Sequence, residues 1–233
     1  MNLSILTWNI ACLPRKLNFF RNPIKQIDNI IRQINNLNCD IICLQEVFDF
    51  DIQKKIIYNF ENNNYNYYIH ETENNIISQN GLIIASKYNL SNNNYLDYSN
   101  FTGPECFIKK GLISSTINTT NNDIIIHNTH MQSDSMGDKM INYCSKIRHK
   151  QHLEIIKYLN NTNTNTNTNT NTNDINILCG DINDDYDYYK LKSFIDNLPY
   201  KYNDYNINKL ITFPKYDEQL DYIITNYNNN INI

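Results

Sequence analysis

The sequence predicts a layered α/β sandwich in which helices pack outside β-sheets. Helical and strand-like segments alternate in the first part of the chain, and strand-like segments dominate its middle. The chain has 233 residues, of which 41% are hydrophobic and 19% charged, and this suits one large domain with a real core.

The first helix is predicted over residues 22–38, where apolar residues recur every three or four positions. Asn22 is a candidate N-cap, and Pro23 falls in the first turn. A second helix is predicted over residues 51–60. Short apolar runs bounded by Asn, Gly and Thr predict the strands of this part of the chain. These strands cover residues 3–10, 40–44, 65–70, 81–86, 107–117 and 123–129.

An Asn-Thr tract interrupts the second half. Residues 161–173 alternate strictly between Asn and Thr, so they have nothing to bury, and a solvated loop is predicted over residues 160–174 within a single domain of residues 1–233. Helices are predicted on either side of it at 144–159 and 187–197, and strands at 175–179 and 220–225.

Composition limits the class of protein. The net charge is -4 and the pI is about 5.7, which gives no general reason to expect non-specific nucleic-acid binding. Asn fills 45 positions, so a single Asn carries little information. The six cysteines form no C-x-x-C pair and several lie in apolar runs, so we expect buried thiols instead of disulfides or a zinc site. With no signal peptide and no apolar run of about 20 residues, we expect a cytoplasmic protein. We also expect the protein to be a monomer.

Polar residues follow four apolar strands at the point where each strand ends. They are Asn9, Glu46, His130 and the pair Asp181 and Asn183. Strand ends on a rigid scaffold are places where catalytic side chains can converge. Carboxylate, amide and imidazole groups form an oxygen-rich set that suits Mg²⁺, with Mn²⁺ as the alternative.

These residues stand in motifs that resemble the endonuclease/exonuclease/phosphatase superfamily, and within it the Mg²⁺-dependent neutral sphingomyelinases. The matching segments occur in the family's order: Leu6-Thr7-Trp8-Asn9, Leu44-Gln45-Glu46-Val47-Phe48, Lys109-Lys110-Gly111, Thr129-His130-Met131-Gln132, Gly180-Asp181-Ile182-Asn183 and Leu220-Asp221-Tyr222-Ile223. The resemblance implies the four-layer α/β sandwich of the deoxyribonuclease I-like type.

The resemblance also implies a role for each motif residue. Glu46, helped by Asn9, would hold Mg²⁺, which neutralises a phosphoryl oxygen and acts as a Lewis acid. Asp181 would orient or deprotonate the attacking water. The remaining implied roles are a hydrogen bond from Asn183 to the developing negative charge, an oxygen contact from His130, substrate binding by Lys110 and support of a catalytic His by Asp221.

One family motif, a terminal Ser-Asp-His segment, has no counterpart. The sequence holds no Asp-His pair and runs twelve residues past Asp221, so the last strand of the fold is expected to be missing. His127 is expected on the strand face opposite that of His130. His149 and His152 are expected at the surface of a helix, and His70 also lies outside the position of the missing motif. Two hypotheses follow: a metal-dependent phosphodiesterase with impaired activity, or a catalytically dead or truncated relative that acts as a binding module.

The sequence says less about the substrate than about the fold or the site. Basic residues are scattered and do not form a groove for nucleic acid, so a lipid headgroup phosphodiester is favoured. Contact with a membrane surface would use Phe19 and Phe20, or the loop from Asp134 to Gly137 with Met131 and Met136. A nuclease and an inositol-phosphate phosphatase are alternatives within the same superfamily.

Overall fold

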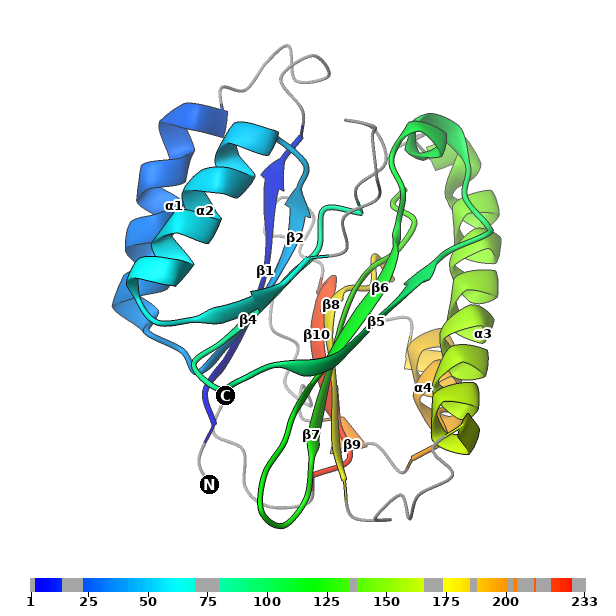
Figure 1. Ribbon diagram of the computed structural model, residues 1–233. Helices are drawn as coiled ribbons and strands as arrows, with labels where there is room; N and C mark the ends of the chain where they lie inside the picture. Colours follow the sequence, from blue (N-terminus) through cyan, green and yellow to red (C-terminus); the bar gives the residue numbers. More distant parts are fainter. Residues whose placement is uncertain are drawn as a thin grey trace.

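Two β-sheets lie face to face in the computed structural model, and helices cover the outer face of each sheet (Figure 1). The four layers are therefore helices, sheet, sheet and helices, which confirms the predicted sandwich. The structure describes residues 3–13, 23–69, 80–134, 138–165, 174–184, 188–200, 203–204, 212 and 219–227.

The first sheet has the strand order β1-β2-β4-β3. Its strands are β1 (Ile5–Cys12), β2 (Ile41–Val47), β3 (Asn66–Tyr68) and β4 (Ile83–Ser86). β1 and β2 are parallel, so the chain between them must cross over, and α1 (Pro23–Leu37) makes this crossing. The helix α2 (Phe50–Asn62) begins where the Asp49 side chain accepts hydrogen bonds from the backbone N–H groups of Asp51 and Ile52.

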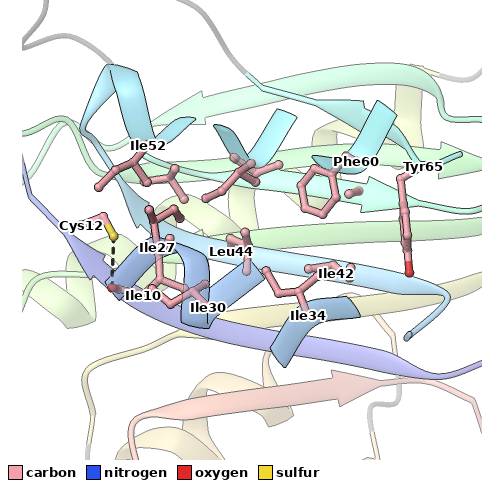
Figure 2. Close-up of a cluster of buried hydrophobic side chains, with 14 residues drawn as sticks. Ile10, Cys12, Ile27, Ile30, Ile34, Ile42, Leu44, Ile52, Phe60 and Tyr65 are labelled. Atoms are coloured by element: carbon pink, nitrogen blue, oxygen red, sulfur yellow. Dashed lines mark hydrogen bonds between the residues drawn. The ribbon is translucent and has the colours of Figure 1, made fainter. Parts of the chain in front are cut away.

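An isoleucine-rich core joins these two helices to the first sheet (Figure 2). Ile27 and Ile34 of α1 and Phe60 of α2 pack against Ile42 and Leu44 of β2. In a strand, alternate residues face opposite sides. The other face of β2 therefore points toward the second sheet.

The second sheet has the strand order β5-β6-β7-β8-β10-β9. Its strands are β5 (Ser91–Asp97), β6 (Gly111–Ile117), β7 (Ile124–His130), β8 (Ile175–Asp181), β9 (Asn203–Asp204) and β10 (Asp221–Thr225). The helices α3 (Ile141–Asn165) and α4 (Tyr188–Asp196) cover its outer face (Figure 1). Two short 3₁₀ helices, η2 (Gly103–Phe107) and η3 (Asp138–Met140), lie in the connections.

A separate apolar core fills the space between the sheets. It includes Ile41 and Cys43 of β2, Ile84 of β4, and Ile126 and Cys179 from the second sheet, all of them fully buried. Both sheets are thus covered on two faces, which explains why their central strands are nearly continuous apolar runs.

Several predictions from the sequence need correction. β5 and β9 were not predicted, because the exposed run Asn92–Asn94 of β5 has no apolar alternation and β9 has only two residues. The loop prediction for 160–174 is wrong up to Asn165, because α3 continues into the tract, and residues 166–173 lie outside the described residues. Other expectations concern residues outside the description: the Asn22 cap, Phe19 and Phe20, His70, Met136 and Gly137, and the chain after Tyr227.

The expected exposure of some side chains is also wrong. His152 is buried and stacks on Phe194, with ring centroids 4.2 Å apart, because this face of α3 packs against α4; His149 is exposed as expected. Met131 is fully buried in the core beneath α3 and α4, so it contributes no rim to a membrane surface. All six cysteines are free and four are buried, whereas Cys39 is intermediate and Cys106 exposed. No described helix is long and apolar enough to cross a membrane.

The buried His127 predicts a loss of stability in acid. Burial lowers the pKa of His127 to about 4, while Ser114 lies 2.6 Å from its Nδ1. The unfolded chain takes up this proton near pH 6.5 and the folded chain only near 4, so the stabilisation is complete above 6.5 and is lost as the pH falls toward 4. We expect the wild type to lose about 1–3 kcal/mol relative to His127→Gln between pH 7 and pH 4.5 in urea unfolding. Parallel pH profiles of the two proteins would contradict this expectation.

Candidate active site

The polar strand ends of both sheets meet at one edge of the sandwich. In the register of the sheets, His130 lies opposite Asp181, and Asp181 lies opposite Asp221. Asn9 lies opposite Gln45, the residue before Glu46. The parallel pairs β1/β2 and β7/β8 therefore bring residues that are far apart in sequence to neighbouring strand ends.

Asn9 connects the two sheets at this edge. Its Nδ2 donates to Glu46 Oε1 at 3.0 Å and to Asp181 Oδ2 at 2.8 Å, while its Oδ1 accepts from the backbone N–H of Ala11 at 3.0 Å. The amide thus lies between a carboxylate of the first sheet and a carboxylate of the second.

Glu46 occupies a strained position beside a β-bulge. Two residues of β1, Ile10 and Ala11, lie opposite it, and its φ is 57°, in the left-handed region that a side chain rarely adopts. Bulges and such strain turn a side chain away from the regular strand direction, and they cluster at functional sites. Its side chain keeps 21% of its surface exposed, so its carboxylate remains accessible from solvent.

His130 is buried beside a lysine and two carboxylates. Its Nε2 lies 3.0 Å from Lys110 Nζ and 3.7 Å from both Glu46 Oε1 and Asp181 Oδ2. Burial, and then the Lys110 charge, hold the pKa of His130 well below its usual range. The neutral ring accepts from Lys110 at Nε2, which places the ring proton on Nδ1.

Lys110 is a buried cation, 5% exposed. Its Nζ lies 2.8 Å from Glu105 Oε1, and it also donates to the backbone carbonyl of Met131. Glu105 in turn accepts from the backbone N–H of Ser133 at 3.1 Å. The structure therefore places Lys110 against His130 and Glu105, and its predicted substrate contact stays a prediction.

Asp181 and Asp221 form a buried acidic pair. Burial, and then the neighbouring Asp221, raise the pKa of Asp181 to about 8, while burial raises the pKa of Asp221 to about 6. The backbone N–H of Asn183 donates to Asp181 Oδ1 at 3.0 Å. Asn183 has a φ of 54° and uses one amide proton to bind the Met131 carbonyl at 3.0 Å.

The donor set fits a hard divalent cation. The carboxylates of Glu46 and Asp181 meet at the Asn9 Nδ2 group, no thiol is among these side chains, and Asp221 Oδ1 is buried without a hydrogen-bond partner among the described residues. No group of three His, Cys, Asp or Glu side chains in the described part of the chain forms a complete metal site. Mg²⁺ needs fewer protein ligands than three, because it is commonly held by one or two carboxylates together with water and substrate phosphate.

The sequence reasoning assigned no role to four buried polar residues around the site. Gln45 and Asn128 pair across the two sheets, Glu105 binds Lys110, and Arg148 binds Asp184 Oδ1 and the Gln132 carbonyl. A polar residue inside a buried apolar strand was the available signal for Gln45. Asn128 was hidden by the abundance of Asn in this chain.

Two facing sheets with helices outside them, and this cluster at one edge, define the class of deoxyribonuclease I-like α/β sandwiches. The family model described as the Endonuclease/Exonuclease/phosphatase family matches residues 6–228, and the chain belongs to this family. No curated protein sequence matches the chain.

Solved structures share the fold at low sequence identity. A beta toxin mutant from Staphylococcus aureus, described with bound magnesium ions, aligns with a TM-score of 0.77 and 20% identity, over 97% of this chain and 84% of that one. Sphingomyelinase C from Streptomyces griseocarneus aligns with 0.71 and 18%, over 97% and 84%. ANGEL2, described as a 2′,3′-cyclic phosphatase, aligns with 0.68 and 14%, again over 97% and 84%.

Proposed function

We propose that this protein is a divalent-metal-dependent phosphodiesterase that hydrolyses sphingomyelin-type phosphodiesters. The observation that carries the proposal is the Asn9 amide held between Glu46 and Asp181, with His130 beside both carboxylates. Membership of the family and the sphingomyelinase among its structural relatives support the choice of reaction and substrate.

Glu46 and Asn9 would hold the ion, with Mg²⁺ favoured over Mn²⁺; Asn9 would do so through Oδ1, which in the structure accepts from the Ala11 backbone N–H. The ion, when bound, neutralises a phosphoryl oxygen and acts as a Lewis acid. The magnesium in the beta toxin relative supports this assignment.

The remaining residues supply proton transfer and hydrogen bonds. Asp181 is held at both carboxylate oxygens, by Asn9 and by the Asn183 backbone, and is oriented to accept a proton from an attacking water. Asn183 Nδ2 has a second proton to donate to the developing charge. His130, kept neutral by burial and Lys110, would contact a non-bridging oxygen, and Asp221 would keep Asp181 basic.

We propose that turnover is slow. Among the described residues, His130 is the imidazole that reaches the carboxylates, while His127 lies against Ser114 and His152 stacks on Phe194. In the described part of the chain, no second imidazole lies beside Glu46 and Asp181 to serve as a further general acid or base. Loss of one general acid or base typically costs about 10²–10⁴ in rate.

The experiment measures phosphocholine release from sphingomyelin vesicles, and cleavage of duplex DNA, with Mg²⁺ and with EDTA. We expect Mg²⁺-dependent release by the wild type and a loss of about 10²-fold or more in Glu46→Gln. Glu61→Gln on the exposed surface of α2 is the matched control and should behave as the wild type.

Each other outcome contradicts a defined part of the proposal. DNA cleavage without phosphocholine release would contradict the substrate and favour a nuclease. Equal activity of wild type and Glu46→Gln would contradict the assigned site. Hydrolysis of neither substrate in the presence of Mg²⁺ would favour the binding-module hypothesis.

A further inference from the structure

The site is divided between two sheets that meet mainly through apolar contacts. Glu46 and Asn9 come from the first sheet, and His130 and Asp181 come from the second. The core between the sheets consists mainly of isoleucines with Cys43 and Cys179. Apolar packing is non-directional, so it does not by itself fix how one sheet is positioned over the other.

Asn128 makes directional contacts across this apolar interface. From β7 its Nδ2 donates to the backbone carbonyls of Leu44 and Ile83, both at 2.9 Å. These two residues are partners in the β2–β4 register, so one amide binds two strands of the facing sheet. Its Oδ1 accepts from Gln45 Nε2 at 2.7 Å, and both side chains are fully buried.

Gln45 extends the connection to the strand that carries Asn9. Its Nε2 lies 3.1 Å from Thr7 Oγ1 on β1 in addition to its contact with Asn128. The amide pair therefore links β7 of the second sheet to β1, β2 and β4 of the first. A backbone carbonyl gives a fixed reference, because unlike a long side chain it cannot move without moving its strand.

This pair lies directly behind the site. Gln45 precedes Glu46, and Asn128 stands two residues before His130, on the same face of β7. Asn128 lies opposite Cys179, which stands two residues before Asp181 on β8. A shift between the sheets at Asn128 would therefore change the separation of Glu46 from His130 and Asp181.

We propose that Asn128, paired with Gln45, is the positioning residue that fixes the two halves of the site relative to each other. This inference rests on the proposed function only where its test measures hydrolysis. The relative position of the residues proposed to hold the cation is a property of the fold, so it can be tested by metal binding alone. A misplacement of about 1 Å at a reacting centre can cost about 10²-fold in rate.

The test compares Asn128→Ala with His127→Gln, the adjacent residue on the opposite face of β7. Both are buried polar residues of one strand, but His127 contacts Ser114 and Asn176 within the second sheet. Mn²⁺ binding is measured by the electron paramagnetic resonance of free Mn²⁺, at a temperature where far-UV circular dichroism shows both variants folded. We expect the dissociation constant for Mn²⁺ to rise about 10–100-fold in Asn128→Ala and to stay unchanged in His127→Gln.

Hydrolysis of bis(p-nitrophenyl) phosphate gives the second readout. We expect kcat to fall about 10²-fold in Asn128→Ala with little change in KM, because the substrate still binds while the reacting groups are misplaced. If Asn128→Ala does not fold, Gln45→Met carries the test, since it keeps the side-chain length and removes the amide.

The outcomes separate this inference from the proposed function. Mn²⁺ affinity lost in Asn128→Ala but kept in His127→Gln supports the positioning role, even if the wild type hydrolyses no phosphodiester. Equal Mn²⁺ affinity in wild type, Asn128→Ala and Gln45→Met would overturn it. Equal losses in Asn128→Ala and His127→Gln would also overturn it, since they would show a general loss of stability.

Discussion

Replacing Asp181 with Asn is expected to lower phosphodiester hydrolysis about 10²–10⁴-fold while making the metal-free protein more stable at pH 8. The loss of activity follows from the proposed role of Asp181, whose carboxylate would accept the proton of the attacking water. The gain in stability follows because Asp181 is buried next to Asp221, and its pKa is raised to about 8.

The direction of the stability change depends on pH. In the unfolded chain Asp181 ionises near 3.8, whereas in the folded chain it ionises near 8. The folded state is therefore favoured by the bound proton at low pH, and this advantage is lost as the pH rises through 8. Asn keeps an acceptor for the Asn9 amide without the charge, so its benefit should be largest at pH 8 and absent at pH 4.

Differential scanning calorimetry in EDTA measures this effect. We expect Asp181→Asn to melt a few degrees above the wild type at pH 8, since about 1 kcal/mol shifts the melting temperature of a chain of this size by roughly 2–4 °C. Glu61→Gln, on the exposed surface of α2, is the control and should melt at the temperature of the wild type. A lower melting temperature for Asp181→Asn than for the wild type at pH 8 would contradict the burial of Asp181 beside Asp221 as the cause of its raised pKa.

Replacing Gly180 with Ala is expected to destabilise the fold by about 3–5 kcal/mol. Gly180 has a φ of +140°, and an added Cβ would lie 2.0 Å from the Thr129 carbonyl oxygen of the neighbouring strand. The obstructing atom belongs to the backbone of β7, one residue before His130, so it can move only if the central strands separate.

Urea unfolding gives the measurement for Gly180→Ala, and Gly81→Ala gives the comparison. At Gly81 the added Cβ would meet the Phe48 ring at 2.6 Å, and a side chain can rotate away, so we expect a smaller loss there despite its φ of +65°. If Gly180→Ala unfolds at the urea concentration of the wild type, the close approach of β7 and β8 is not as described.

The residues of the candidate site could be predicted from the sequence, but the contacts between them could not. Glu46, His130 and Asp181 follow recognisable apolar strands, so their positions at strand ends follow from local pattern. The contact of Asn9 with both Glu46 and Asp181 joins residues 37 and 172 positions apart, and no local pattern contains it. Lys110 illustrates the same limit, since its burial against Glu105 and His130 depends on where η2 lies.

His152 and Met131 show why exposure was harder to predict than secondary structure. Both were assigned to the surface, and both lie in the layer between the second sheet and its helices. Burial of a helical residue depends on which neighbour covers its face, and for His152 that neighbour is α4, which begins 36 residues later in the chain.

Local sequence pattern was sufficient for the order of the main strands and helices, the layered fold and the residue types of the site. These features depend on hydrophobic period and on turn and cap residues, which act over a few positions. The tertiary structure alone decided that the site spans two sheets, that Asn128 and Gln45 join them, and that Asp181 and Asp221 share one buried region. These features arise when distant strands are brought together and water is removed from between them, because only then do charge, burial and hydrogen bonding act on residues far apart in the chain.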